Sequence, residues 1–261
     1  MATKIMIGNH KGGAAKTQTA LEMAYYLAKK EKRVLFIDVD PQANATKILS
    51  KNTPTEKRVL PDILINGDEI MHDDISSCKL DTAGHHIDYI ASGLRAGRLE
   101  SRLSDDTPKE YVLKDALETI EKDYDFIIID TPPSAEIVVI NSLIASDYVL
   151  LTCNAAMFGS DGVDKLMPII NGIQRRPRMN PNLRVLGILV TMYENFIDCN
   201  QTVNDLCDKY GDFVLFPYIR RTTQVGQSNR HYSFIQEYRP RSTSACDYRQ
   251  VFDQLFQIDE P

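Results

Sequence analysis

Two lysines, two adjacent glycines and a threonine lie close together near the start of the chain, between Lys11 and Thr17. This segment follows a short apolar run at residues 4–8 and leads into residues 17–30, where apolar residues recur at helical spacing. Glycines let a backbone approach a ligand closely, and the N–H groups at a helix N-terminus attract anions. Lysine ammonium groups pair with phosphate oxygens, and a threonine hydroxyl coordinates Mg²⁺. The segment therefore predicts a polyphosphate site; the alternative is a glycine-bearing turn with two surface lysines.

Three aspartates follow two other apolar runs. Asp38 ends the run at residues 33–38, Asp40 comes two positions later, and Asp130 ends the run Phe126–Asp130. In a parallel sheet the carboxyl ends of the strands meet at one edge, so we expect these acids near the phosphate segment. Carboxylates at such a place hold Mg²⁺ or position an attacking water. For each acid taken alone, the alternative is a helix N-cap or a solvated strand end.

Strand and helix patterns alternate along the whole chain, which predicts one doubly wound, mainly parallel α/β sheet flanked by helices. We see no linker or internal repeat, so we expect a single domain covering residues 1–261. The expected strands are at residues 4–8, 33–38, 87–91, 126–130, 148–152, 184–191 and 213–216, and the expected helices are at residues 17–30, 109–122, 137–145, 162–174, 202–210 and 244–256.

The composition limits the class of protein. The chain has 261 residues, 43% of them hydrophobic, and a formal net charge of −6. This excludes a protein that is basic over its whole surface but permits a local basic face. Five cysteines, none of them in a C-x-x-C pair, predict reduced thiols and give no support for a zinc or iron–sulfur site. No apolar run reaches the roughly 18 residues of a membrane span, and we expect a cytoplasmic protein.

The phosphate segment departs from the common pattern G-x-x-x-x-G-K-[ST], which would require glycines where the chain has His10 and Ala15. It matches instead the deviant form K-G-G-x-x-K-[ST], from Lys11 to Thr17. Together with the two acidic segments, it resembles the ParA/MinD family of deviant Walker-box ATPases, and its ParA-type branch in particular. The resemblance extends over most of the chain and implies a P-loop fold and Mg²⁺-dependent ATP hydrolysis.

The resemblance implies a role for each residue of these segments. Lys16 is expected to bind the β- and γ-phosphates, and Asp40 to position the attacking water. Lys11 is expected to reach the phosphates of a second copy in a nucleotide-sandwich homodimer, so the expected catalytic residues are these three. The expected metal ligands are Thr17, Asp38 and Asp130, and the expected nucleotide-binding residues of the loop are Lys11, Gly12, Gly13, Ala14, Ala15, Lys16, Thr17 and Gln18.

Two residues of the loop depart from the family pattern. Ala15 replaces a glycine, and alanine is strained by roughly 1 kcal/mol if its φ is positive. Gln18 replaces a threonine or serine that touches the α-phosphate, and its amide can still donate a hydrogen bond. We therefore expect hydrolysis that is slow in the isolated protein. Met192, Pro217 and Tyr218 are expected near the adenine; the alternative for them is ordinary packing at a sheet edge.

Arginines cluster in the last part of the chain. Arg220, Arg221 and Arg230 stand in a stretch that contains a single acid up to Arg241. The resemblance implies nonspecific DNA binding by the ATP-bound dimer, so we expect these three arginines to contact phosphate groups; the alternative is a solvated charged face. It also implies a ParB-like adaptor protein that stimulates hydrolysis and a location at the nucleoid. Residues 251–261 contain three acids and no lysine or arginine, so no membrane binding is expected.

The leading hypothesis is thus a ParA-type ATPase that positions or partitions a plasmid, a chromosome or a protein assembly such as a carboxysome. The first alternative is a metabolic enzyme on the same fold, such as an ATP-dependent amidating synthetase. The second is a nucleotide-dependent transcriptional regulator, although no dedicated DNA-reading helix is evident in the sequence.

Overall fold

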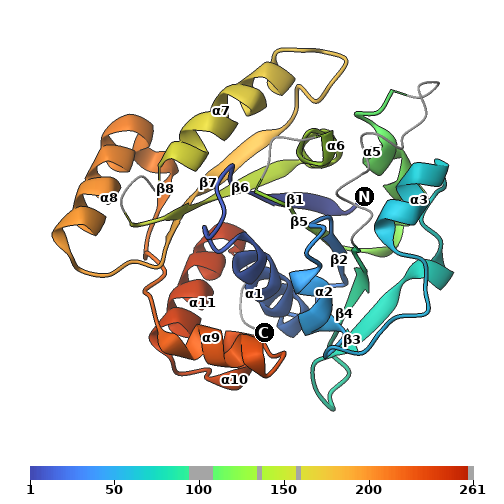
Figure 1. Cartoon of the computed structure of the whole chain (residues 1–261), viewed down its shortest axis with the longest axis horizontal. Coiled ribbons are helices and arrows are strands. Elements are labelled where there is room, and N and C mark those ends of the chain that lie inside the picture. Colours follow the sequence, from blue (N-terminus) through green and yellow to red (C-terminus); the bar gives the residue numbers. More distant parts are fainter. Residues whose placement is uncertain (94–107, 134–136, 157–159, 258–261) are drawn as a thin grey trace.

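A twisted sheet forms the centre of the molecule (Figure 1). The computed structural model describes residues 1–93, 108–133, 137–156 and 160–257. Within these ranges the eight strands have the order β3-β4-β2-β5-β1-β6-β7-β8, and the pairs are parallel except for β3 with β4. The predicted fold class, a mainly parallel sheet flanked by helices, is confirmed. The strands are β1 (Thr3–Gly8), β2 (Val34–Asp38), β3 (Ser76–Lys79), β4 (His86–Ile90), β5 (Phe126–Asp130), β6 (Tyr148–Asn154), β7 (Arg184–Thr191) and β8 (Val214–Leu215).

Helices cover both faces of the sheet (Figure 1). One apolar core lies between the sheet and helices α1, α2, α10 and α11, and a second lies between the opposite face and helices α3 and α5–α8. The helices are α1 (Lys16–Lys29), α2 (Asn44–Leu49), α3 (Leu60–Asn66), α5 (Val112–Leu117), α6 (Ile137–Ala145), α7 (Asp161–Gln174), α8 (Ile197–Tyr210), α9 (Thr223–Arg230), α10 (Ile235–Tyr238) and α11 (Thr243–Phe256).

The central strands bring the predicted site residues to one edge of the sheet. All five residues of β2 are buried, as are the last four of β5, because helices pack on both faces. Parallel pairing places Asp38 opposite Asp130, and it places β1 between β5 and β6. The segment that follows β1 therefore begins beside both acidic strand ends, as the sequence predicts.

The structure differs from the predicted elements in several regions. A single helix was expected at residues 109–122, but the chain forms the short helix α5 and then a 3₁₀ turn at Glu121–Asp123. The β-branched pair Thr119–Ile120 lies between them and favours helix weakly. Strand β3 and helices α2, α3, α9 and α10 had no prediction from the sequence.

Candidate nucleotide site

The loop between β1 and α1 is held in place by the ends of neighbouring strands. The Asn9 side chain accepts a hydrogen bond from the Lys11 N–H at 2.6 Å. The Asn154 side chain, at the end of β6, donates to the Gly13 carbonyl at 3.1 Å, and the Thr191 hydroxyl, at the end of β7, donates to the Ala14 carbonyl at 3.4 Å. These two hydrogen bonds fix the orientation of the Gly13 and Ala14 carbonyl groups, and with them the shape of the loop.

The loop backbone is shaped as an anion cradle. The N–H groups of Gly12, Gly13 and Ala14 have no hydrogen-bond partner among the residues that the structure describes. A Cβ atom added at Gly12 or Gly13 would meet no atom within 4 Å, and Gly13 has a φ of 72°. Ala15 precedes α1 with a φ of 57°, so the predicted backbone strain of roughly 1 kcal/mol applies to it. Open space beside unpaired N–H groups at a helix N-terminus fits phosphate.

Lys16 lies inside this cradle. Its side chain is buried, and its ammonium group donates to the Lys11 carbonyl at 3.1 Å. Burial lowers the pKa of Lys16, and the nearby carboxylates of Asp130 and Asp40 partly oppose this effect. A buried ammonium group that donates to a backbone carbonyl can exchange that contact for phosphate oxygens.

Asp130 is the acid that lacks partners. It is fully buried, and neither of its oxygens has a hydrogen-bond partner in the described parts of the chain. Burial, followed by the charge of Asp38, raises its pKa well above the usual range. The Thr17 hydroxyl lies close enough to oppose this rise but does not complete a hydrogen bond with either oxygen. A buried, unsatisfied carboxylate beside a threonine hydroxyl fits a Mg²⁺ site.

The other two acids have different surroundings. Asp38 is fully buried, and its oxygens accept hydrogen bonds from the Asp40 N–H at 3.1 Å and from the N–H and hydroxyl of Thr46 at 2.8 and 2.7 Å. Burial raises the pKa of Asp38 to about 6, although the bonds from Thr46 oppose the rise. Asp40 accepts from the Gln42 N–H at 2.9 Å and also lines the cavity. The protein therefore uses Asp38 to hold the turn that carries Asp40.

These acids do not form a metal cage by themselves. The described residues contain no group of three or more histidine, cysteine or acidic side chains able to hold a metal ion. Mg²⁺ in phosphate sites takes one or two protein oxygens, with phosphate oxygens and water completing its coordination. The residues present fit that mode, because Asp130 interacts with Thr17 and Lys16 and has Asp38 as a neighbour.

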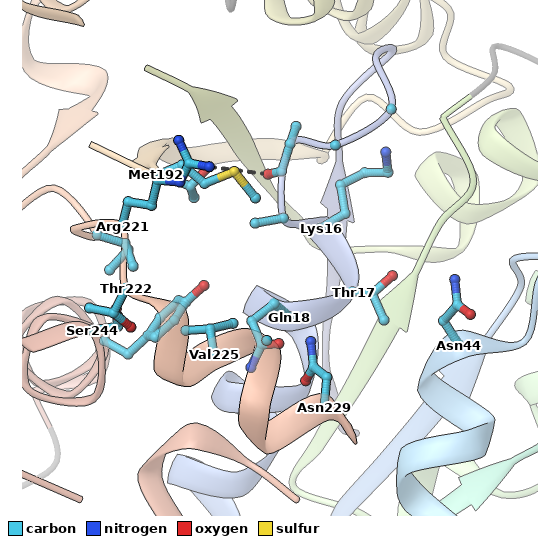
Figure 2. A pocket seen from close by; sticks show the side chains of 18 of the residues that line it. Lys16, Thr17, Gln18, Asn44, Met192, Arg221, Thr222, Val225, Asn229 and Ser244 are labelled. Carbon is cyan, nitrogen blue, oxygen red and sulfur yellow. Dashed lines mark hydrogen bonds between the residues drawn. The ribbon is translucent and has the colours of Figure 1, made fainter. Parts of the chain in front are cut away.

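A cavity of about 490 Å³ lies in front of the loop (Figure 2). Lys16, Thr17 and Gln18 form one wall, and Figure 2 shows Met192 and Arg221 on the opposite wall. The volume is within the range of small-molecule sites. The rest of the far wall comes from residues near α9 and α11, which are Ile219, Arg220, Thr222, Val225, Gly226, Asn229, Ser244 and Tyr248.

The residues predicted to lie near the adenine are divided between two hollows. Met192 lines the cavity with the phosphate loop. Pro217 and Tyr218 line a neighbouring hollow of about 330 Å³, together with Phe216, and Arg220 contributes to both hollows. The sequence pointed to the segment that follows β8 but missed Ile219–Thr222 and helix α9. The low apolar content of α9 gives no periodic signal from which it could have been found.

The predicted DNA-binding arginines have different environments. Arg220 is ion-paired with the buried Asp247, at 2.6 Å, and Arg221 with Glu194, at 3.1 Å. Both arginines also line the cavity. Arg230 is exposed at the last residue of α9, away from that lining. The structure thus brings two of the three arginines to the nucleotide cavity.

The fold, the cradle and the acids define a P-loop ATPase with a deviant phosphate loop, and comparison with known proteins agrees. Residues 2–185 match the family model described as an AAA domain. The chain is 31% identical over 249 residues to the sporulation initiation inhibitor protein Soj of Bacillus subtilis. This alignment covers 95% of this chain and 96% of that protein. It is 30% identical to the chromosome partitioning protein ParA of Caulobacter vibrioides, over 86% of this chain and 82% of that protein.

Among solved structures, cobyrinic acid a,c-diamide synthase from Mycobacterium smegmatis with bound ATP analogue and magnesium is similar with a TM-score of 0.83. Its identity is 27%, and the match covers 98% of this chain and 95% of that one. The chain belongs to the ParA/MinD family of deviant Walker-box ATPases. In the parts of the chain that the structure describes, no helix is long and apolar enough to span a membrane.

Proposed function

We propose that this protein is a ParA-type ATPase that positions or partitions a cargo within the cytoplasm. The observation that carries the proposal is the deviant loop itself, in which a buried Lys16 and an exposed Lys11 flank a cradle of N–H groups. Within the described residues, these N–H groups and the nearby Asp130 carboxylate have no hydrogen-bond partner. The names of the similar Soj and ParA proteins, with identities of 31% and 30%, support the partitioning role.

Binding and hydrolysis are assigned to residues on the near wall of the cavity. The cradle N–H groups and Lys16 bind the phosphates of ATP, and Lys16 offsets the charge that develops on them during hydrolysis. Thr17 and Asp130 hold Mg²⁺, with Asp38 in support. When bound, Mg²⁺ neutralises phosphate charge and orients the phosphate oxygens. Asp40, at the end of the turn held by Asp38, orients the attacking water.

Lys11 and Lys16 differ in a way that favours a dimer. Lys16 is buried within its own loop, whereas Lys11 is exposed on the outer side of that loop. We assign Lys11 to the phosphates bound by a second copy in an ATP-sandwich homodimer. ATP then closes the dimer, and hydrolysis reopens it.

The exposed arginines are assigned to nonspecific DNA. The Arg221 side chain is 65% exposed and that of Arg220 is 52% exposed, so their ion pairs leave part of each guanidinium available to phosphate groups. Arg230 extends this set from the end of α9. A ParB-like adaptor stimulates hydrolysis and releases the dimer from the nucleoid, so the cargo is a plasmid, a chromosome or a protein assembly.

The test is binding to a random-sequence DNA duplex in the presence of ATP, ADP or no nucleotide, measured over a range of salt concentrations. We expect binding that requires ATP, weakens steeply with salt, and is lost in Lys11→Ala and reduced in Arg230→Ala. Arg178→Ala, which removes an exposed arginine outside the proposed surface, is the matched control. DNA binding that is equal with ATP and with ADP would contradict the proposed cycle.

The similarity to the diamide synthase structure favours a second candidate, an ATP-dependent amidating enzyme. Such an enzyme needs a carboxylate substrate beside the γ-phosphate. ATP hydrolysis that rises with a carboxylate metabolite and is unaffected by DNA would favour this candidate over the partitioning role.

A further inference from the structure

An exposed apolar patch lies at the outer end of the sheet. Seven large apolar side chains are exposed among the described residues, and five of them fall between Met192 and Phe216. Phe196 is 64% exposed, Ile197 86% and Phe216 64%. Phe196 and Ile197 stand at the start of α8, which contacts the edge strand β8, and Phe216 follows β8 directly (Figure 1). These last three residues are called the α8 patch below.

Ring contacts and a hydrogen bond join the two segments that carry the patch. The Phe216 ring meets the Tyr218 ring edge-on, with 5.5 Å between their centroids, and the Tyr218 ring lies 5.2 Å from that of Tyr193. The Tyr193 hydroxyl donates to Oδ1 of Asn200 on α8 at 2.7 Å. The same three rings line the hollow of about 330 Å³ beside the nucleotide cavity. The start of α8 and the segment after β8 are therefore joined, with an aromatic hollow beside them.

The patch residues on α8 contribute little to the fold that carries them. Phe196 occupies the N-cap position of α8, and its side chain makes no capping hydrogen bond there. A serine, threonine, asparagine or aspartate at an N-cap stabilises a helix by about 1 kcal/mol. The buried residues Cys199, Val203 and Leu206 lie on the opposite side of the helix from Ile197. Large exposed apolar side chains that gather in one place indicate a binding surface.

The surroundings of the patch are acidic. Residues 192–219 contain five acids and a single lysine, Lys209, which is ion-paired with an acid of α7. The two arginines that follow this stretch are also ion-paired with acids. Because a helix turns by about 100° per residue, Asp205 and Asp208 share the exposed side of α8 with Ile197. The exposed face of α8 thus carries an apolar end and a negative charge along its length.

This combination fits one kind of partner. DNA and anionic lipid are negatively charged, so the acids of α8 would repel both. A second copy that paired face to face through the patch would place the same acids against each other. A protein segment that has apolar side chains and several lysines or arginines meets both requirements. Its apolar side chains cover the patch, and its cations reach the acids or the faces of the exposed rings.

We propose that the α8 patch is the docking surface for a cationic amphipathic segment of a partner protein. The apolar side chains of that segment contact Phe196, Ile197 and Phe216, and one of them enters the adjacent aromatic hollow. Its lysines or arginines follow Asp205 and Asp208 along α8. The three patch residues do not line the nucleotide cavity, so docking requires no nucleotide. The proposal therefore stands or falls separately from the proposed ATPase cycle.

The experiment uses fluorescent model peptides of about 18 residues and the full chain without nucleotide. The first peptide has leucine and lysine at the spacing of an amphipathic helix. The second has glutamate in place of each lysine, and the third has serine in place of each leucine. Fluorescence anisotropy should show at least tenfold tighter binding of the leucine–lysine peptide than of the other two, because only that peptide supplies both apolar side chains and cations.

Variants of the protein locate the binding surface. Phe196→Ser/Ile197→Ser should weaken binding of the leucine–lysine peptide by roughly tenfold. Met71→Ser is the matched control, because it removes an exposed apolar side chain close to β3, at the opposite edge of the sheet. This control should bind the peptide like the wild-type protein. Equal affinity of the wild-type protein and Phe196→Ser/Ile197→Ser would overturn the proposal.

A second pair of variants tests the charge. Asp205→Asn/Asp208→Asn should weaken binding of the leucine–lysine peptide by roughly threefold at low salt and by less at high salt. Asp115→Asn/Glu118→Gln, which removes two exposed acids of the α5 region, should leave binding unchanged. An equal loss in the two double variants would mean that only the overall charge of the protein attracts the peptide. That result would overturn the proposal, as would equal binding of the leucine–glutamate peptide.

Light scattering of the wild-type protein without nucleotide tests the other occupant of the patch. We expect the same molar mass for the wild-type protein and for Phe196→Ser/Ile197→Ser. A wild-type dimer that becomes a monomer in this variant would assign the patch to a second copy of the chain and would overturn the proposal. Steady-state ATP hydrolysis by the variant should equal that of the wild-type protein, so a loss of peptide binding is distinguishable from damage to the nucleotide site.

Discussion

The two walls of the cavity are built in opposite ways. The near wall is formed mainly by a continuous segment, Gly12–Gln18, whose residues all derive from one strand–loop–helix unit. The far wall is assembled from Met192 after β7, the Ile219–Thr222 segment, α9 and α11. The near wall presents backbone N–H groups and the Lys16 ammonium group. The far wall combines apolar side chains with Arg220, which is ion-paired with Asp247. The groups expected to bind phosphate thus belong to one local motif, whereas the shape of the far wall depends on the tertiary fold.

The largest expected effect concerns the two lysines of the phosphate loop, Lys11 and Lys16, which we expect to differ in their effect on ATP binding. Lys16→Ala removes the buried ammonium group from the cradle, and we expect it to lower ATP hydrolysis by roughly 10²–10³-fold and to weaken ATP binding. Lys11→Ala should lower hydrolysis similarly while it leaves ATP binding by the monomer nearly unchanged. Steady-state ATPase assays and equilibrium binding of a fluorescent ATP analogue measure both effects.

Lys114→Ala, on the exposed side of α5, is the matched control for this pair. An equal loss of ATP affinity in Lys11→Ala and Lys16→Ala would show that both lysines serve the same phosphates. In that case the proposed assignment of Lys11 to the phosphates of a second copy would be wrong.

The next effect concerns the far wall. Asp247 is 3% exposed and accepts hydrogen bonds from the Arg220 N–H at 3.0 Å, Nε at 3.0 Å and Nη2 at 2.6 Å. Asp247→Asn should weaken this anchor, destabilise the protein by about 1–2 kcal/mol, and weaken ATP binding by roughly tenfold without a change in the maximal hydrolysis rate. Glu194→Gln alters the exposed partner of Arg221 and should have little effect. Loss of the maximal rate in Asp247→Asn would mean that the far wall takes part in the chemistry.

A third effect tests Glu22, which links the near wall to α10. Its pKa is raised to about 7 in the folded protein, above its value in an unfolded chain, so folding favours its protonated form. The stabilisation is therefore complete at acidic pH and is lost as the pH rises through 7. Relative to Glu22→Gln, the wild-type protein should lose up to about 1.4 kcal/mol of unfolding free energy per pH unit between pH 5 and pH 7. Urea denaturation without nucleotide measures the unfolding free energy at each pH. If this free energy depends on pH in the same way in the two proteins, Glu22 does not titrate in this range.

The smallest expected effect concerns the strained end of the loop. Ala15 has a φ of 57°, which glycine adopts without a steric penalty. Ala15→Gly should stabilise the protein by up to about 0.5 kcal/mol, because the relief of roughly 1 kcal/mol of strain is partly offset by the greater freedom of the unfolded chain. Ala14→Gly, at a neighbouring buried position without a positive φ, should destabilise it. Thermal denaturation of the two variants distinguishes strain in the near wall from ordinary packing.

The contrast between the walls also explains what the sequence predicts. The near wall follows from local patterns, because an apolar strand, a glycine-bearing loop and a helix position Lys16 and Thr17 whatever packs around them. The acidic strand ends follow from the rule that parallel strands present their carboxyl ends at one edge. The positive φ of Ala15 was anticipated only conditionally, from the glycine it replaces in the family pattern.

The far wall depends on contacts between residues far apart in the sequence. Nothing in the sequence near Arg220 indicates that Asp247 will hold it, because the partners belong to different elements joined only in the fold. Gln18 is a similar case: its type permits donation to a phosphate, but in the fold its amide nitrogen donates to Glu22. The roles proposed for Pro217 and Tyr218 stay predictions, since these residues line the neighbouring hollow.

The most direct test of the ATPase cycle is the molar mass of the Asp40→Ala variant, measured by light scattering with ATP, with ADP and with no nucleotide. This variant keeps the cradle, Lys11 and Asp130 but lacks the residue assigned to the attacking water, so ATP should persist. The account predicts a dimer with ATP and a monomer with ADP, with the ATP dimer lost again in Lys11→Ala/Asp40→Ala. A mass that is the same with ATP and ADP would contradict the account.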